Sequence, residues 1–142
     1  IPHNFAQCEQ TGRIDNFVFA AGIKAGKYRG YQFNDSDVFK AIEGAANSLL
    51  LHPDKNLEHY LDSVIVFIAA AQEPDGYLYT PRRLITPDYA PPGGEKRWVG
   101  MKNHSHELYN AGHLYEAGAA HYLATGNTVL PPIADNNRTW TG

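Results

Sequence analysis

The chain has 142 residues, of which 43% are hydrophobic and 19% are charged, and its formal net charge is -3 with neutral histidines. This length and composition predict one globular domain with a packed core. The weakly acidic balance argues against a surface built for nucleic acid or for anionic membranes. The longest apolar run, residues 64–71, is too short to cross a bilayer. We therefore expect neither a nucleic-acid partner nor a membrane partner.

Cys8 is the only cysteine of the chain. It allows no intrachain disulfide and no multi-cysteine zinc site, so we expect no metal ligands within this chain alone. The localisation stays open, since a single cysteine is compatible with a periplasmic, a secreted or a cytoplasmic compartment. The chain begins at Ile1 without a methionine. We therefore expect a processed product or a piece of a longer chain.

Apolar side chains recur at three- and four-residue spacing in four segments, and this spacing predicts helices. Asp35 and Asp37 open the second segment and are candidates for its N-cap, and Asp54 is the N-cap candidate of the third. Pro53 ends the second segment because it excludes the helical conformation at the residue before it. The four predicted helices cover residues 8–25, 34–51, 54–71 and 105–125.

The connections between these helices differ greatly in length. The second and third helices are only a few residues apart, which predicts an antiparallel hairpin. Residues 77–102 form a long connection rich in proline and glycine, and a connection of this length is typically functional or disordered. No pair of segments shows the alternation of strands. The predicted fold class is therefore all-α, built from helical hairpins.

The fourth predicted helix carries a polar stripe. At helical spacing His106, Tyr109, Asn110, His113 and Ala117 share one face. Side chains of His, Tyr and Asn both donate and accept hydrogen bonds, so this face could read the hydroxyls of a sugar. The alternative is a solvated helix face with one histidine satisfied in the core.

Two further groups of residues are candidate sites. His106 and Glu107 begin like a zinc-protease motif, but the second histidine is replaced by Asn110, so the signature fails. Asp35, Asp37 and Glu43 could act as paired carboxylates in glycoside hydrolysis. Helix capping by the two aspartates explains them more simply, and Glu43 could pair with a surface lysine.

Five segments together resemble glycoside hydrolase family 127 and its close relative family 146. Their order and spacing also match over residues 1 to about 130. The segments are TGRIDNF at 11–17, NDSDVFK at 34–40, EGAA at 43–46, IAAAQEPDGYL at 68–78, and SHELY at 105–109 with its continuation to 117.

The resemblance implies that residues 1–130 form the N-terminal portion of an (α/α)6 toroid. Such enzymes release L-arabinofuranose from β-linked arabinofuranosides of plant glycans with retention. Their nucleophile is a cysteine thiolate ordered by a zinc ion on cysteines and a glutamate, and a second glutamate is the acid/base. All of these residues lie beyond the matched stretch. We therefore expect no catalytic residue in this chain, no zinc bound to it alone, and no activity by itself.

The resemblance also implies binding residues. His106 matches a histidine that lines the sugar pocket and would donate or accept a hydrogen bond there, and Asp35 and Asp37 match a motif near that pocket. With Tyr109 and His113 from the polar stripe, they form the predicted substrate-binding set. Two alternatives stay open: a non-catalytic helical domain that binds carbohydrate or a protein partner, and an active enzyme completed by another chain.

Residues 131–142 depart from the family pattern. They begin with two prolines, which prevent a helix from continuing there, and are otherwise mostly polar. We expect a divergent polar tail. A third of a toroid would also leave inner helix faces uncovered, which predicts self-association.

Overall fold

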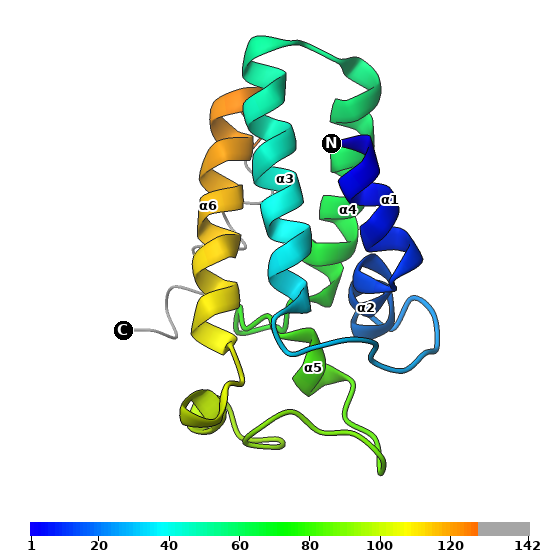
Figure 1. Ribbon diagram of the computed structural model, residues 1–142, viewed down its shortest axis with the longest axis vertical. Coiled ribbons are helices and arrows are strands. Elements are labelled where there is room, and N and C mark those ends of the chain that lie inside the picture. The colour runs from blue at the N-terminus through cyan, green and yellow to red at the C-terminus, as the bar shows by residue number, and fades with distance from the viewer. Residues whose placement is uncertain (128–142) are drawn as a thin grey trace.

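The computed structural model describes residues 1–127 of the chain (Figure 1). In this part the all-α prediction is confirmed, because the described residues contain helices and one isolated bridge between Thr86 and Tyr89 but no strand. None of the described helices is both long enough and apolar enough to span a bilayer. The elements are α1 (Pro2–Gln10), α2 (Arg13–Ala20), α3 (Asn34–Leu51), α4 (Lys55–Ala71), α5 (Thr80–Arg83), the 3-10 helix η1 (Val99–Asn103) and α6 (Glu107–Thr125).

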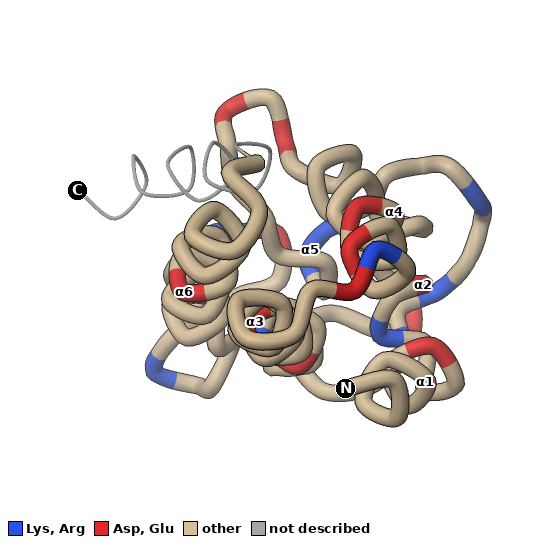
Figure 2. The backbone as a smooth tube through the Cα atoms, turned by 90° about the horizontal axis from the view of Figure 1, so that it is seen from above, with Lys and Arg blue, Asp and Glu red and all other residues tan. Residues whose placement is uncertain are grey.

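Helix α3 lies at the centre of the molecule. Figure 2, viewed along the long helices, shows α6 on one side of α3 and α1, α2 and α4 on the other. In Figure 1, α3 and α6 run side by side in the same direction, so both helices begin at the same end of the molecule. Helix α4 returns antiparallel to α3, as the short connection predicts, although the most extensive packing of α3 is against α6.

The core fills the space between these helices. Helix α3 contributes Val38 and Ile42, α4 contributes Leu61, and all three side chains are fully buried. The rings of Phe17 and Phe39 pack with centroids 5.7 Å apart, which joins α2 to α3. Burying each such side chain stabilises the fold by about 1.5–3 kcal/mol, so the core holds α2 and α4 firmly against α3.

The first predicted helix is wrong in its extent. Residues 8–25 do not form one helix, because α1 ends at Gln10 and α2 begins at Arg13. Gly12 between them has a φ of 77°, in the left-handed region that glycine adopts without steric cost. The apolar spacing continues across this break, so the pattern hid it. The start of α1 was missed because Pro2 occupies the first helical turn, where proline is well tolerated.

The other three helices agree closely with the predictions. Helix α3 ends at Leu51, two residues before Pro53, and α4 begins after Asp54, whose Oδ1 accepts hydrogen bonds from two backbone amides. Helix α6 begins at Glu107 rather than at residue 105. The predicted tail, residues 131–142, lies outside the described residues.

Helix capping by Asp35 and Asp37 is not observed, and that interpretation is wrong. The N-cap of α3 is Phe33, and no side chain caps the helix. Both aspartates lie in the first turn and are bound to groups from other elements: Asp35 by Thr80 and Asp37 by Arg13. Local sequence could not distinguish a cap from a long-range partner, because a carboxylate in the first turn suits both.

Candidate functional site

A hollow lies where α3 and α6 begin. Its volume is about 340 Å³, and it brings together three of the five residues predicted to bind substrate. They are His106, Tyr109 and Asp37, joined by Phe33 and Lys40, which the sequence analysis did not select. The two helices create this hollow because they run parallel and present their first turns at the same end.

His106 lies just before α6 rather than within it. Its φ is 62°, an uncommon left-handed conformation for a residue with a side chain. Its Nδ1 lies 2.6 Å from the carbonyl oxygen of His104. Because a carbonyl only accepts, Nδ1 must donate this bond, and in the neutral ring Nε2 is then an acceptor. The ring also packs edge-on against Phe33, with centroids 5.6 Å apart.

Tyr109 and Lys40 form the polar rim between the two helices. The Lys40 ammonium donates to the Tyr109 hydroxyl oxygen at 2.6 Å and lies 5.0 Å from the ring centroid. Since the oxygen accepts from lysine, the phenolic hydrogen can be donated to another molecule. The Tyr109 side chain is exposed, so this donor is accessible to a ligand.

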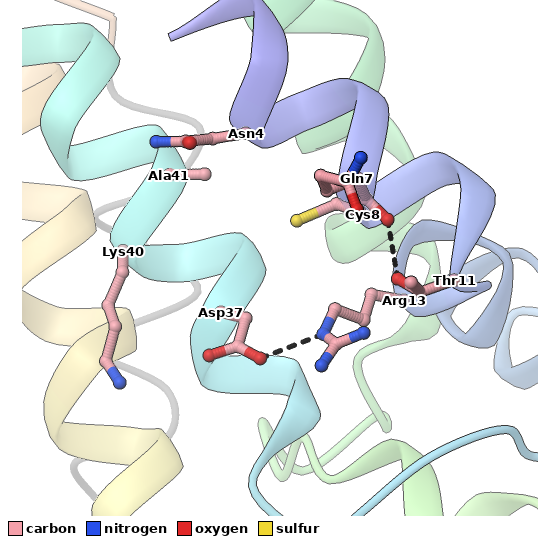
Figure 3. A pocket seen from close by; sticks show the side chains of 8 residues that line it. All are labelled: Asn4, Gln7, Cys8, Thr11, Arg13, Asp37, Lys40 and Ala41. Atoms are coloured by element: carbon pink, nitrogen blue, oxygen red, sulfur yellow. Dashed lines mark hydrogen bonds and ion pairs between the residues drawn. The ribbon is translucent and has the colours of Figure 1, made fainter.

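Asp37 separates this hollow from a second one of about 410 Å³, shown in Figure 3. One carboxylate oxygen accepts a hydrogen bond from Arg13 Nε at 2.8 Å. In Figure 3 the Lys40 side chain points away from this ion pair, toward α6. The two hollows share Asp37 and Lys40, so they adjoin across α3.

Asp35 does not enter either hollow. It is almost fully buried, and its two oxygens accept from the Thr80 amide at 2.9 Å and the Thr80 hydroxyl at 2.6 Å. Burial raises the pKa of the carboxyl to about 6, against the lowering effect of the two Thr80 hydrogen bonds. In this structure Asp35 holds α5 against the first turn of α3.

His113 also lies apart from the hollow, one turn further along α6. Its ring packs edge-on against Tyr109, with centroids 4.7 Å apart. Its Nδ1 is 3.3 Å from a carboxylate oxygen of Glu116. These two residues and Glu43 of α3 place three ligand atoms within 4.8 Å of one another, a group that could hold a metal ion.

The face predicted for α6 is therefore divided. Asn110 is buried and donates to the Gln32 carbonyl at 3.0 Å, and Ala117 is fully buried. These two residues pack toward α3 rather than forming part of an open stripe. The stripe argument placed His106 on the helix, whereas the residue precedes it.

The carboxylate of Glu107, next to His106, is the centre of a buried network that the sequence analysis missed. The Arg82 guanidinium forms an ion pair with it, and the side chains are 6% and 1% exposed. The Tyr77 hydroxyl donates to Oε1 at 2.5 Å and the Ser105 hydroxyl to Oε2 at 2.8 Å. The Trp98 amide donates to both oxygens, at 3.1 and 3.2 Å.

This network fixes the conformation of the segment that carries His106. Trp98, His104 and His106 all have left-handed φ angles of 62–67°, each of which costs about 1–3 kcal/mol. Such angles persist where surrounding contacts over-determine the backbone. Arg82 also donates to the Gly94 carbonyl at 2.9 Å and to the Pro92 carbonyl at 3.3 Å. The long connection 77–102 is thus an ordered support for the hollow.

The zinc site that the family resemblance implies does not fit the residues of this chain. Such a site requires several cysteines, and Cys8 is the only one. It lies in the wall of the second hollow, and burial raises the pKa of its thiol. A thiol that resists ionisation is a poor nucleophile and a poor metal ligand.

The arrangement can recognise hydroxyl groups. The hollow offers a lysine ammonium and a phenol as donors, a carboxylate and an imidazole nitrogen as acceptors, and an aromatic ring as an apolar wall. This combination suits a small polyhydroxylated ligand.

Comparisons with known proteins identify the family of the chain. Residues 1–141 match the family model described as "Beta-L-arabinofuranosidase, GH127 catalytic domain". A non-reducing end β-L-arabinofuranosidase of Bifidobacterium longum subsp. longum is 38% identical over 121 residues, which are 85% of this chain and 18% of that protein.

Solved structures show the same relationship. A GH127 β-arabinofuranosidase superposes with a TM-score of 0.91 and 48% identity, over 99% of this chain and 22% of that one. A GH127 β-L-arabinofuranosidase of Geobacillus stearothermophilus T6 superposes with a TM-score of 0.83 and 38% identity, over 92% and 19%. The chain thus spans about a fifth of the length of these relatives, and its helices correspond to part of their (α/α)6 toroid. The chain belongs to the β-L-arabinofuranosidase family of GH127 catalytic domains.

Proposed function

We propose that this chain forms one wall of the sugar pocket of a retaining glycoside hydrolase that acts on β-L-arabinofuranosides of plant glycans. Residues 1–130 would be the N-terminal portion of its (α/α)6 toroid. The observation that supports this role is the hollow at the start of α3 and α6, where His106, Tyr109 and Asp37 converge. Its volume of about 340 Å³ falls in the usual range for small-molecule sites.

In this proposal His106 is the main sugar-binding residue. Its Nε2 accepts a hydrogen bond from a sugar hydroxyl, while the Nδ1 bond to His104 fixes the ring. The Tyr109 hydroxyl and the Lys40 ammonium provide donors beside it, since the Tyr109 ring packs edge-on against the His106 ring with centroids 5.8 Å apart. Asp37 accepts a further hydroxyl with the oxygen that Arg13 leaves available. His113 supports the Tyr109 ring and contacts the sugar only through it.

The chemical step requires residues from outside these 142. The nucleophilic thiolate, the acid/base glutamate and the zinc ion that orders the thiolate belong to the rest of the enzyme. Cys8 is no substitute, because burial disfavours its thiolate. The chain alone is therefore expected to bind sugar without hydrolysing it.

Calorimetric titration with L-arabinose tests the binding role. The chain should bind the sugar, and H106A should lower the affinity by about tenfold or more, as for loss of a well-placed hydrogen bond to a ligand. H59A is the matched control, since His59 is an exposed histidine of α4. The absence of binding by the parent chain, or equal loss in both variants, would contradict the proposal.

A chromogenic β-L-arabinofuranoside separates binding from catalysis. We expect no turnover by the chain alone, with or without added zinc. Turnover that disappears in H106A would instead favour the alternative of an active enzyme completed by a second chain. Sugar binding without turnover would also be expected of a non-catalytic carbohydrate-binding domain. The mass of the native protein distinguishes that role from a part of the sugar pocket of a larger enzyme. A native chain several times heavier supports the enzyme.

A further inference from the structure

A second polar cluster lies on the same pair of helices, beyond the sugar hollow. It consists of Glu43 on α3 and of His113 and Glu116 on α6. We propose that these three residues form a binding site for a divalent zinc ion. The site is separate from the cysteine-based zinc of the catalytic machinery and does not depend on the proposed sugar binding.

The helix geometry brings the three ligands together. His113 and Glu116 are three residues apart on α6 and therefore lie on one face, and α3 packs alongside and presents Glu43. Helical bundles hold metals in a related way, with a histidine and a glutamate three residues apart on one helix and a further glutamate from its neighbour. Zinc takes histidine nitrogen and carboxylate oxygen at about 2.0–2.2 Å. The observed separations within 4.8 Å can close around such an ion by side-chain rotation.

The imidazole of His113 supplies the strongest argument. Its Nδ1 is shielded from solvent, forms no hydrogen bond within residues 1–127, and lies 3.3 Å from a Glu116 oxygen. An unprotonated Nδ1 and a carboxylate oxygen at this distance repel each other, and a cation bound to both atoms would remove the repulsion. The edge-on contact with Tyr109 restricts the ring and so keeps Nδ1 near the Glu116 carboxylate.

The charge around the cluster favours a cation. Within residues 1–127 neither Glu43 nor Glu116 forms an ion pair with a lysine or an arginine. Lys40 lies one turn before Glu43 but donates to the Tyr109 hydroxyl. Two carboxylates and one imidazole therefore face one another without a fixed positive side chain.

The cluster is also accessible to an ion from solution. The Glu116 side chain is 61% exposed, so an ion can enter without opening the core. Three protein ligands leave one tetrahedral position for water, as in many zinc sites that are not fully closed.

Equilibrium dialysis of the protein against zinc chloride, with metal analysis, tests the site. One zinc ion per chain should be retained. E43Q and H113Q should each weaken binding by more than about tenfold, because changes even to groups that only support ligands cost 10–100-fold. H59Q, an exposed histidine change on α4, should leave the affinity unchanged. Circular dichroism of each variant confirms that the helices are intact.

The decisive variant is E43Q. A single surface histidine can hold zinc weakly by itself, and such binding would not depend on a residue from the other helix. Zinc retention that is equal in the parent chain and E43Q would overturn the proposal, as would the absence of retained zinc in the parent. Neither result bears on L-arabinose affinity, so the two proposals fail independently.

Discussion

The two glutamates of α6 show opposite uses of the same side chain. Glu107, at the start of the helix, is 1% exposed and accepts hydrogen bonds from Arg82, Tyr77, Ser105 and Trp98. Glu116, in the third turn, is 61% exposed and faces a histidine nitrogen that has no hydrogen bond in the described part of the chain.

The difference shows how to separate structural from ligand-binding groups in this protein. A carboxylate whose acceptor sites are all used has nothing left for a ligand and serves the fold. A carboxylate with open positions, next to another unsatisfied group, can bind something else. By this criterion Glu107 and Asp35 are structural, while His106, Tyr109 and Glu116 are available.

The largest expected effect is loss of the Glu107 charge. E107Q leaves the Arg82 guanidinium buried without its partner, which should lower the free energy of unfolding by about 3–5 kcal/mol. E116Q, the matched change on the same helix, should alter it by less than about 0.5 kcal/mol. Urea denaturation of both variants measures the contrast, and equal effects would invalidate the comparison.

The next effect concerns Asp35 and has a defined pH dependence. Burial raises its pKa from 3.8 to about 6, so between these values the folded chain holds a proton that the unfolded chain has released. Stability from this group is therefore greatest at low pH and is lost as pH rises through 6. The free energy of unfolding of the parent relative to D35N should fall from pH 4 to pH 7, by on the order of 2 to 3 kcal/mol. Urea denaturation at both pH values measures it, and a constant difference would contradict the burial argument.

A smaller effect is expected at Tyr109. Y109F removes the phenolic donor of the hollow and should weaken L-arabinose binding by about two- to tenfold, the equivalent of one ordinary hydrogen bond. Stability should change by less than about 0.5 kcal/mol, because the side chain is exposed. Y122F, a second half-exposed tyrosine on α6, provides the control for calorimetric titration. An equal loss of L-arabinose affinity in Y109F and Y122F would show that the Tyr109 hydroxyl does not donate to the sugar.

The smallest effect is expected for self-association. Leu51 and Leu123, at the far end of α3 and α6 from the hollow, are 77% and 70% exposed. If uncovered helix faces associate, the double variant L51S/L123S should shift sedimentation velocity profiles toward the monomer, with the helical content unchanged. Identical profiles for parent and variant would show that these two leucines do not take part in contacts between copies of the chain.

Sequence alone determined the long helices and the family. Helices α3, α4 and α6 follow from periodic apolar residues, and the ends near Pro53 and Asp54 follow from local backbone chemistry. The family follows from motif order, and the match of one motif selects His106 as a candidate binding residue. These features are local, so a contiguous stretch of sequence contains the information.

Only the tertiary structure decided what the polar residues do. Asp35 and Asp37 are two positions apart and look equivalent as helix caps. In the structure Asp35 is buried and accepts hydrogen bonds from Thr80, whereas Asp37 borders both hollows. Glu107 pairs with Arg82, which is 25 residues away in the sequence. Glu43 lies near His113 only because α3 and α6 pack together. The strength of a charge interaction depends on the burial of the group and on its partners in space. Neither can be derived from the spacing of residues along a short stretch of sequence.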